Sequence, residues 1–156
     1  QHVISGEHAA VNAAIDILEE EFSIDPVVIE QRVPMHSSRF RPVADLLAPA
    51  LAAAKFLPAR RPYLPNVLAQ LLPQPDHATI TGLLLRHVYE SVRWRESIEL
   101  LCETLPSVSF IEVGPRGVLY NLLSPRWKRV DRYKTDSPAD IQTAFTATCA
   151  RLRDAA

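Results

Sequence analysis

The stretch VVIEQRVPMHSSRFRPVADLL, from Val27 to Leu47, decides the fold predicted for this chain. Its first part, 27–33, is rich in β-branched side chains and predicts a strand. Its second part carries apolar residues at helical spacing, and Pro42 is well placed for the first turn of a helix. His36 lies at the junction between the two. In an α/β sheet, the end of a strand points into the crevice where such folds bind ligands.

Strands and helices alternate along the rest of the chain, which predicts an α/β fold with a largely parallel sheet. Further strands are expected at His2–Ser5, Phe110–Val113 and Arg129–Lys134, with a short extended segment at Pro62–Val67. Helices are expected after Gly6, after Ser37, from Thr79, from Arg95 to Leu105, and over a last segment that contains 141–152. Pro49 falls inside the second of these helices and is expected to kink it.

The composition is that of an ordinary soluble domain of 156 residues. Its 17 basic and 18 acidic side chains give no electrostatic footprint for nucleic acid or for an anionic membrane. No apolar run is long enough to span a bilayer, and QHVISGEHAAV has no basic region of a secretion signal, so a cytoplasmic location is expected. Cys102 and Cys149 form no CxxC pair and are interpreted as buried free thiols.

Several kinds of site are excluded by spacing. The 4 glycines cannot be written into GxGxxG, GxxxxGK or the nucleophile elbow GxSxG. The 5 histidines and 2 cysteines match no zinc pattern, so no metal site is expected. Among the histidines, His36 stands out because an imidazole at a strand end can take a proton from a hydroxyl nucleophile. The alternative is a histidine that only hydrogen-bonds a loop.

Five pieces of sequence occur in order: VISGEHAAV, RVPMHSSRFRPVADLL, PYLPNV, LLRHVYESVRWRESIELL and FIEVGPRGVLYNLL. Together they resemble the C-terminal part of malonyl-CoA:acyl carrier protein transacylases and of polyketide synthase acyltransferase domains. The resemblance runs from Gln1 to about Leu123. The tail, with YKTDS at Tyr133–Ser137, is most similar to the discrete trans-acting acyltransferases that serve polyketide synthases.

This resemblance implies two structural parts. Residues 1–33 correspond to the second half of a ferredoxin-like small subdomain, as one strand, one helix and one strand. Residues 34–156 correspond to the C-terminal part of an α/β hydrolase-like core with a parallel sheet. One departure from the family lies in FIEVGPRGV, where Arg116 stands at a position commonly occupied by glycine.

The resemblance also implies a chemistry. In this family a serine of a GHSxG elbow attacks the acyl thioester of malonyl-CoA, and the acyl group then passes to the phosphopantetheine thiol of an acyl carrier protein, without a further cofactor. V-P-x-H-S-x-x-F-x-P matches the segment around the family's base, so His36 is the expected general base. The main-chain carbonyl of His87 is expected to orient it, while the His87 side chain is interpreted as having no catalytic part.

Two further residues are implied to bind the substrate. Phe40 belongs to the same motif, and Met35 precedes the base. Family members carry residues at the Met35 position that crowd the α-carbon of the acyl group, which favours malonyl over methylmalonyl. Met35 as a side chain that fills a gap in the core is an equal alternative.

No stretch of the chain matches the GHSxG serine motif, so the expected partner is an N-terminal half that carries it. An acyl carrier protein and a polyketide synthase are the other expected partners. Two alternatives stay open: a non-catalytic docking module for carrier proteins or synthases, and part of an acyl hydrolase. The sequence does not separate transferase from hydrolase, nor does it settle the acyl group.

Overall fold

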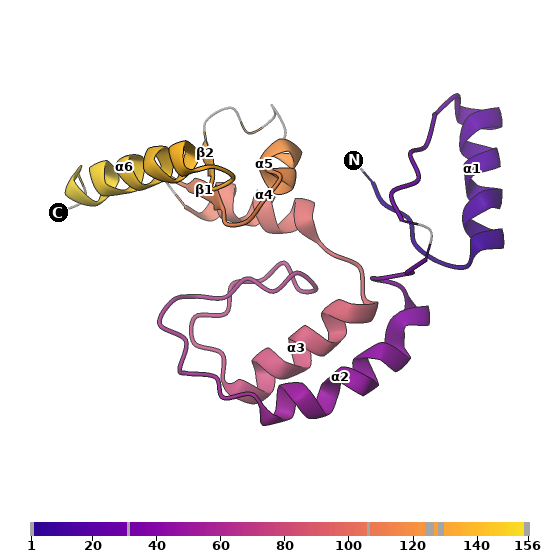
Figure 1. The fold of residues 1–156 in the computed structure, drawn as a ribbon, viewed down its shortest axis with the longest axis horizontal. Helices are drawn as coiled ribbons and strands as arrows, with labels where there is room; N and C mark the ends of the chain where they lie inside the picture. Colours follow the sequence, from indigo (N-terminus) through magenta and orange to yellow (C-terminus); the bar gives the residue numbers. More distant parts are fainter. Residues whose placement is uncertain (1, 31, 106, 124–126, 128–129, 155–156) are drawn as a thin grey trace. The chain divides into compact units, whose positions relative to one another are not determined.

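The computed structural model describes residues 2–30, 32–105, 107–123, 127 and 130–154. The chain forms two compact units, His2–Ser97 and Ile98–Ala156, apart from its first residue (Figure 1). The mixture of helices with a small parallel sheet confirms the predicted α/β class. No helix in the described ranges is both long enough and apolar enough to cross a membrane.

The first helix, α1, spans His8–Phe22 and confirms the helix predicted after Gly6. It ends where Ser23 adopts a left-handed backbone with φ of 53°. The amide of Ile24 then bonds back to the carbonyl of Leu18 at 2.9 Å. This closing bond is the usual way in which a helix satisfies its last carbonyl groups.

The two strands predicted on either side of α1 do not form among the described residues. Residues 2–5, 27–30 and 32–33 carry no strand, and of the strand–helix–strand expected for 1–33 only the helix is present among the described residues. The β-branched side chains of this segment stay exposed, with Val27 at 81% and Ile29 at 69%. A strand needs a neighbour that accepts and donates its backbone hydrogen bonds, and composition alone does not provide one.

The centre of the first unit is a pair of helices that lie side by side (Figure 1). The 3-10 turn η1 at Ser38–Phe40 leads into α2, Arg41–Ala53, with Pro42 in its first turn as predicted. The helix continues through Pro49. Its neighbour α3, His77–Tyr89, begins at Asp76, whose carboxylate caps the amide of Thr79 at 2.7 Å. Between these helices, the predicted extended segment forms a single antiparallel bridge from Tyr63 to Leu72.

Helix α4, Trp94–Thr104, leads into the second unit. Strand β1, Ser109–Glu112, pairs in parallel with β2, Asp131–Lys134, so that Ser109 lies opposite Asp131. The predicted strand began at Arg129, which lies outside the described residues. Helix α6, Pro138–Asp154, packs against β2 and confirms the predicted final helix.

A short helix that was not predicted, α5 at Val118–Leu122, follows β1. The Glu112 carboxylate accepts the amides of Leu119 and Tyr120 at 3.1 and 2.8 Å. Its carbonyl accepts the hydroxyl of Thr135 at 3.2 Å. Glu112 therefore ties together a strand, the helix that follows it, and the loop after β2.

The Arg116 backbone explains why glycine suits its position. Arg116 has a φ of 80°, in the left-handed region that side chains disfavour by about 1–2 kcal/mol. Its amide donates to the Asp136 carboxylate at 2.9 Å, a bond that any residue can make. After the entropy cost of glycine is subtracted, Arg116→Gly is expected to raise the free energy of unfolding by about 0.5–1 kcal/mol.

Thermal denaturation followed by circular dichroism measures this gain. The matched control is Arg116→Ala, which removes the same guanidinium group but keeps a Cβ in the left-handed region. Equal stabilities of the glycine and alanine variants would show that backbone strain at this position is not the cause.

Candidate active site

A tight turn presents His36. The amide of Met35 donates to the Val33 carbonyl at 2.9 Å, and the Ser37 hydroxyl donates to the Pro34 carbonyl at 2.7 Å. His36 itself has a φ of 61°, a left-handed backbone unusual for a residue other than glycine or asparagine. Strain of this kind costs about 1–3 kcal/mol and is concentrated at functional sites.

The end of α3 holds His36 by two bonds. The His36 amide donates to the Val88 carbonyl at 3.1 Å, and its ring nitrogen Nδ1 lies 2.8 Å from the His87 carbonyl. Both carbonyls belong to the last turn of α3, where no amide of the same helix is left to pair with them. A carbonyl only accepts hydrogen bonds, so Nδ1 carries the hydrogen and donates it. The other nitrogen of His36, Nε2, is thereby left with a lone pair that can take a proton.

The ring of His87 lies against the ring of His36. Their centroids are 4.9 Å apart, with an angle of 33° between the ring planes. Asn66 Nδ2 lies 2.8 Å from Nε2 of His87 and donates to it. Burial lowers the pKa of His87, and the charge of His36 lowers it further. The His87 imidazole is therefore held in its neutral form.

Asn66 comes from a turn that sequence reasoning did not select. Pro65 and Val67 are buried on either side of it, and the carbonyl of Asn66 accepts the Arg93 amide at 2.7 Å. The Arg93 side chain donates to the Leu68 carbonyl at 3.0 Å. The sequence offered PYLPNV only as one piece of a resemblance. No pattern in this segment predicts a contact with a histidine 21 positions away.

The structure places Met35 on the turn of His36 and Phe40 on the 3-10 turn η1 that follows it. Met35 is 45% exposed, so it fills no core within the described part of this chain. Phe40 is half-buried and ends η1. Their contact with an acyl group stays a prediction.

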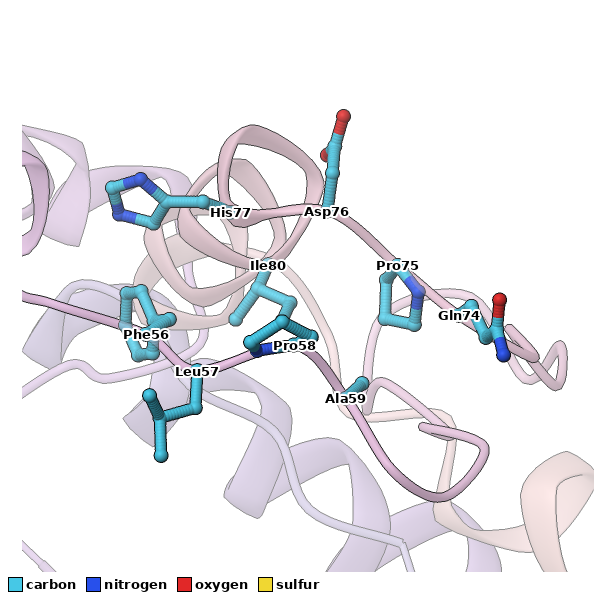
Figure 2. Close-up of a pocket in the computed structure, with 9 residues that line it drawn as sticks. All are labelled: Phe56, Leu57, Pro58, Ala59, Gln74, Pro75, Asp76, His77 and Ile80. Atoms are coloured by element: carbon cyan, nitrogen blue, oxygen red, sulfur yellow. The ribbon is translucent and has the colours of Figure 1, made fainter.

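One hollow in the described part of the chain does not belong to this site. It has a volume of about 480 Å³ and lies between the segments 56–59 and 74–80. Figure 2 shows Phe56 beside His77 at its edge, with their ring centroids 5.0 Å apart. None of the expected site residues lines this hollow.

Other reactive groups give no competing site. The described residues include no cluster of three or more histidine, cysteine, aspartate or glutamate side chains that could hold a metal ion. Both cysteines are free as expected, but each is half-buried and not buried. Burial raises the pKa of the Cys102 thiol, with a further contribution from Glu103, so this thiol is not activated as a nucleophile.

Comparison with known proteins points to one group. The malonyl CoA-acyl carrier protein transacylase of Bacillus subtilis is 31% identical over 146 residues, 93% of this chain and 45% of that protein. The protein of the same name from Salmonella typhimurium is 29% identical, over 94% of this chain and 46% of its own length. No family model matches the chain. The chain thus spans about half the length of the curated relatives that it matches.

Solved structures agree with this comparison. A malonyl-CoA:acyl carrier protein transacylase from Xanthomonas oryzae superposes with a TM-score of 0.80 and 28% identity, over 91% of this chain and 44% of its own. A malonyl-transacylase in complex with a type II polyketide synthase acyl carrier protein superposes with a TM-score of 0.79 and 27% identity, over 89% of this chain and 44% of its own. In sequence and fold, this chain resembles one part of these enzymes, consistent with their C-terminal part.

The hydrogen bonds from the ring nitrogens of His36 and His77 predict opposite neutral tautomers for these two residues. His36 donates from Nδ1, so its neutral form should carry hydrogen there. His77 places Nε2 at 3.4 Å from the Leu51 carbonyl, so its neutral form should carry hydrogen at Nε2 and serves as the control. Long-range ¹H–¹⁵N correlation spectra distinguish the two forms. Hydrogen on Nε2 of His36 would contradict the orientation by the His87 carbonyl.

Proposed function

We propose that this chain is part of an acyltransferase that moves a malonyl or related acyl group from coenzyme A to the thiol of an acyl carrier protein. His36 acts as the general base in this proposal. The names of the relatives support the reaction, and the geometry around His36 supports its role.

The hydrogen bond from His36 Nδ1 to the His87 carbonyl carries the proposal. A general base must offer a lone pair of known direction, and this bond fixes both the tautomer and the plane of the ring. Positive charge formed on the ring also lies at the C-terminal end of α3, where the partial negative charge of the helix stabilises it.

The first half-reaction forms an acyl-enzyme. His36 Nε2 takes the proton of a serine hydroxyl as the serine oxygen attacks the thioester carbonyl. The carbon–sulfur bond of the thioester then breaks, and His36 returns the proton to the leaving thiolate. Coenzyme A departs with a free thiol, and the acyl group remains on the serine as an ester.

The second half-reaction runs the same steps with a different thiol. His36 takes the proton of the phosphopantetheine thiol, whose sulfur attacks the acyl-serine ester. The ester carbon–oxygen bond breaks, and the proton returns to the serine oxygen. One imidazole therefore serves both half-reactions, first as a base and then as an acid.

The acyl group is proposed to lie beside Met35 and Phe40. Met35 is adjacent to the base and 45% exposed, so its side chain is available to contact a substrate. A long thioether next to the α-carbon leaves less room for a methyl branch. We propose malonyl as the preferred acyl group on this ground.

The serine is proposed to come from a polypeptide that corresponds to the remaining length of the relatives. This chain covers 45% of the Bacillus subtilis protein. The stripe expected to bury one face of α2 is open among the described residues, with Leu46 at 81% exposed and Val43 and Leu47 at 38% each. Apolar surface of this kind favours a covering partner. An acyl carrier protein is the proposed second partner, because one of the superposed transacylases is bound to such a protein.

The test combines this chain with that complementing polypeptide and supplies malonyl-CoA and a phosphopantetheinylated carrier protein. Mass spectrometry should show a malonyl adduct first on the complementing polypeptide and then on the carrier protein. His36→Asn is expected to lower kcat by about 10²–10⁴-fold, the usual contribution of a general base. Asparagine tolerates the left-handed backbone at this position, so the turn should persist.

His77→Asn is the matched control and should keep the rate of the unsubstituted protein, since His77 lies at the opposite end of α3 from His87. Release of free malonate without a carrier-protein adduct would show that the assembled protein is a hydrolase and not a transferase. Binding of carrier protein without any adduct would favour the docking module instead.

A further inference from the structure

We propose that the side chain of His87 is a positioning residue. Asn66 holds it as a neutral imidazole against the His36 ring, so that His36 alone takes the proton of the serine hydroxyl or of the thiol. This inference rests on the proposed function for its kinetic consequences. Its structural part, the state of the His87 ring, stands by itself.

The donor from Asn66 sets the form of the His87 ring. An amide nitrogen only donates, so the His87 Nε2 that lies 2.8 Å from Asn66 Nδ2 must be the unprotonated, accepting nitrogen. Protonation of His87 at that nitrogen would set two donors against each other. The cationic form of His87 is therefore disfavoured by its own hydrogen-bond partner.

His87 meets His36 twice. Its carbonyl accepts the hydrogen of His36 Nδ1, and its ring lies 4.9 Å from the His36 ring. A second positive charge at that distance would oppose the positive charge that forms on His36 during catalysis. The lowered pKa of His87, due first to burial and then to the charge of His36, agrees with this arrangement.

Three charged side chains on η1, α2 and α3 contact groups other than His87. Arg86 lies 2.8 Å from Glu90, Arg41 lies over the ring of Tyr89 at 4.3 Å, and Arg39 lies 3.0 Å from Glu7. None of them is among the causes of the lowered pKa of His87. The state of its ring therefore depends on Asn66, burial and His36.

Asn66 is itself held in place. Its carbonyl accepts the Arg93 amide at 2.7 Å, and the Arg93 side chain donates to the carbonyl of Leu68, in the same turn, at 3.0 Å. Buried Pro65 and Val67 flank it. The contact from Asn66 to His87 thus comes from an anchored turn.

The first test is Asn66→Asp in the assembled protein, this chain with its complementing polypeptide. A carboxylate only accepts, so Nε2 of His87 must then carry a hydrogen, and the pKa of His87 should rise beside the new negative charge. Long-range ¹H–¹⁵N spectra at neutral pH should show Nε2 of His87 without hydrogen before the change and with hydrogen after it. Asn12→Asp, on an exposed position of α1, is the control for added charge and should leave Nε2 of His87 without hydrogen. A His87 whose Nε2 still lacks hydrogen in Asn66→Asp overturns the proposal.

The second test is kinetic. Asn66→Asp should lower kcat at neutral pH by about tenfold or more with KM for malonyl-CoA unchanged, and the loss should shrink at higher pH as His87 loses its proton. His87→Gln keeps the orienting carbonyl and should cost only a few-fold. The double variant should match His87→Gln, because no imidazole remains for Asp to charge.

A loss that is the same at every pH, or that persists in the double variant, would mean that Asn66 serves only the fold of its turn. The spectra need no turnover. A protein that transfers no acyl group but shows the expected change at His87 would therefore refute the proposed function and leave the His87 lock standing.

Discussion

One hydrogen bond, from the ring of His36 to the main-chain carbonyl of His87, joins two segments 51 positions apart and determines the chemistry available at the site. It works because the last turn of a helix has carbonyl groups without partners, and His36 satisfies two of them with its amide and its ring. A carboxylate in the same place would bring a permanent charge. A carbonyl fixes the tautomer of the neutral His36 ring without adding a charge.

Most of the helices could be predicted from the sequence, because each carries a local signal. Apolar spacing marked α1, α2, α3, α4 and α6, and Pro42 fixed the start of one of them. The strands were different. The predicted strands β1 and β2 form because each has the other as a partner within the chain. The β-branched segments before and after α1 have no such partner among the described residues. Helix α5 was missed because five residues give too short a period to recognise, and the carboxylate of Glu112 stabilises its start from another element.

The site could be predicted in part. His36 and the carbonyl of His87 were expected only because neighbouring motifs resemble a known family, and their catalytic roles stay predictions. The left-handed backbone of His36 carries no sequence signal, since neither glycine nor asparagine occupies the position. Asn66 could not be found either. Its amide meets a ring 21 positions away through a turn anchored by Arg93, and such a contact exists only once α3 and that turn have packed.

The parallel pairing of β1 with β2 has a consequence for how the second unit acquires its structure. Parallel strands cannot be joined by a tight turn, so the segment that contains α5 must close as a loop before Ser109 meets Asp131. Closing this loop costs chain entropy before any hydrogen bond between the two strands forms. Glu112 lowers this cost, because its carboxylate accepts the first amides of α5 and holds that helix next to β1. The helices of this unit can therefore form early, and the arrival of β2 is expected to set the folding rate.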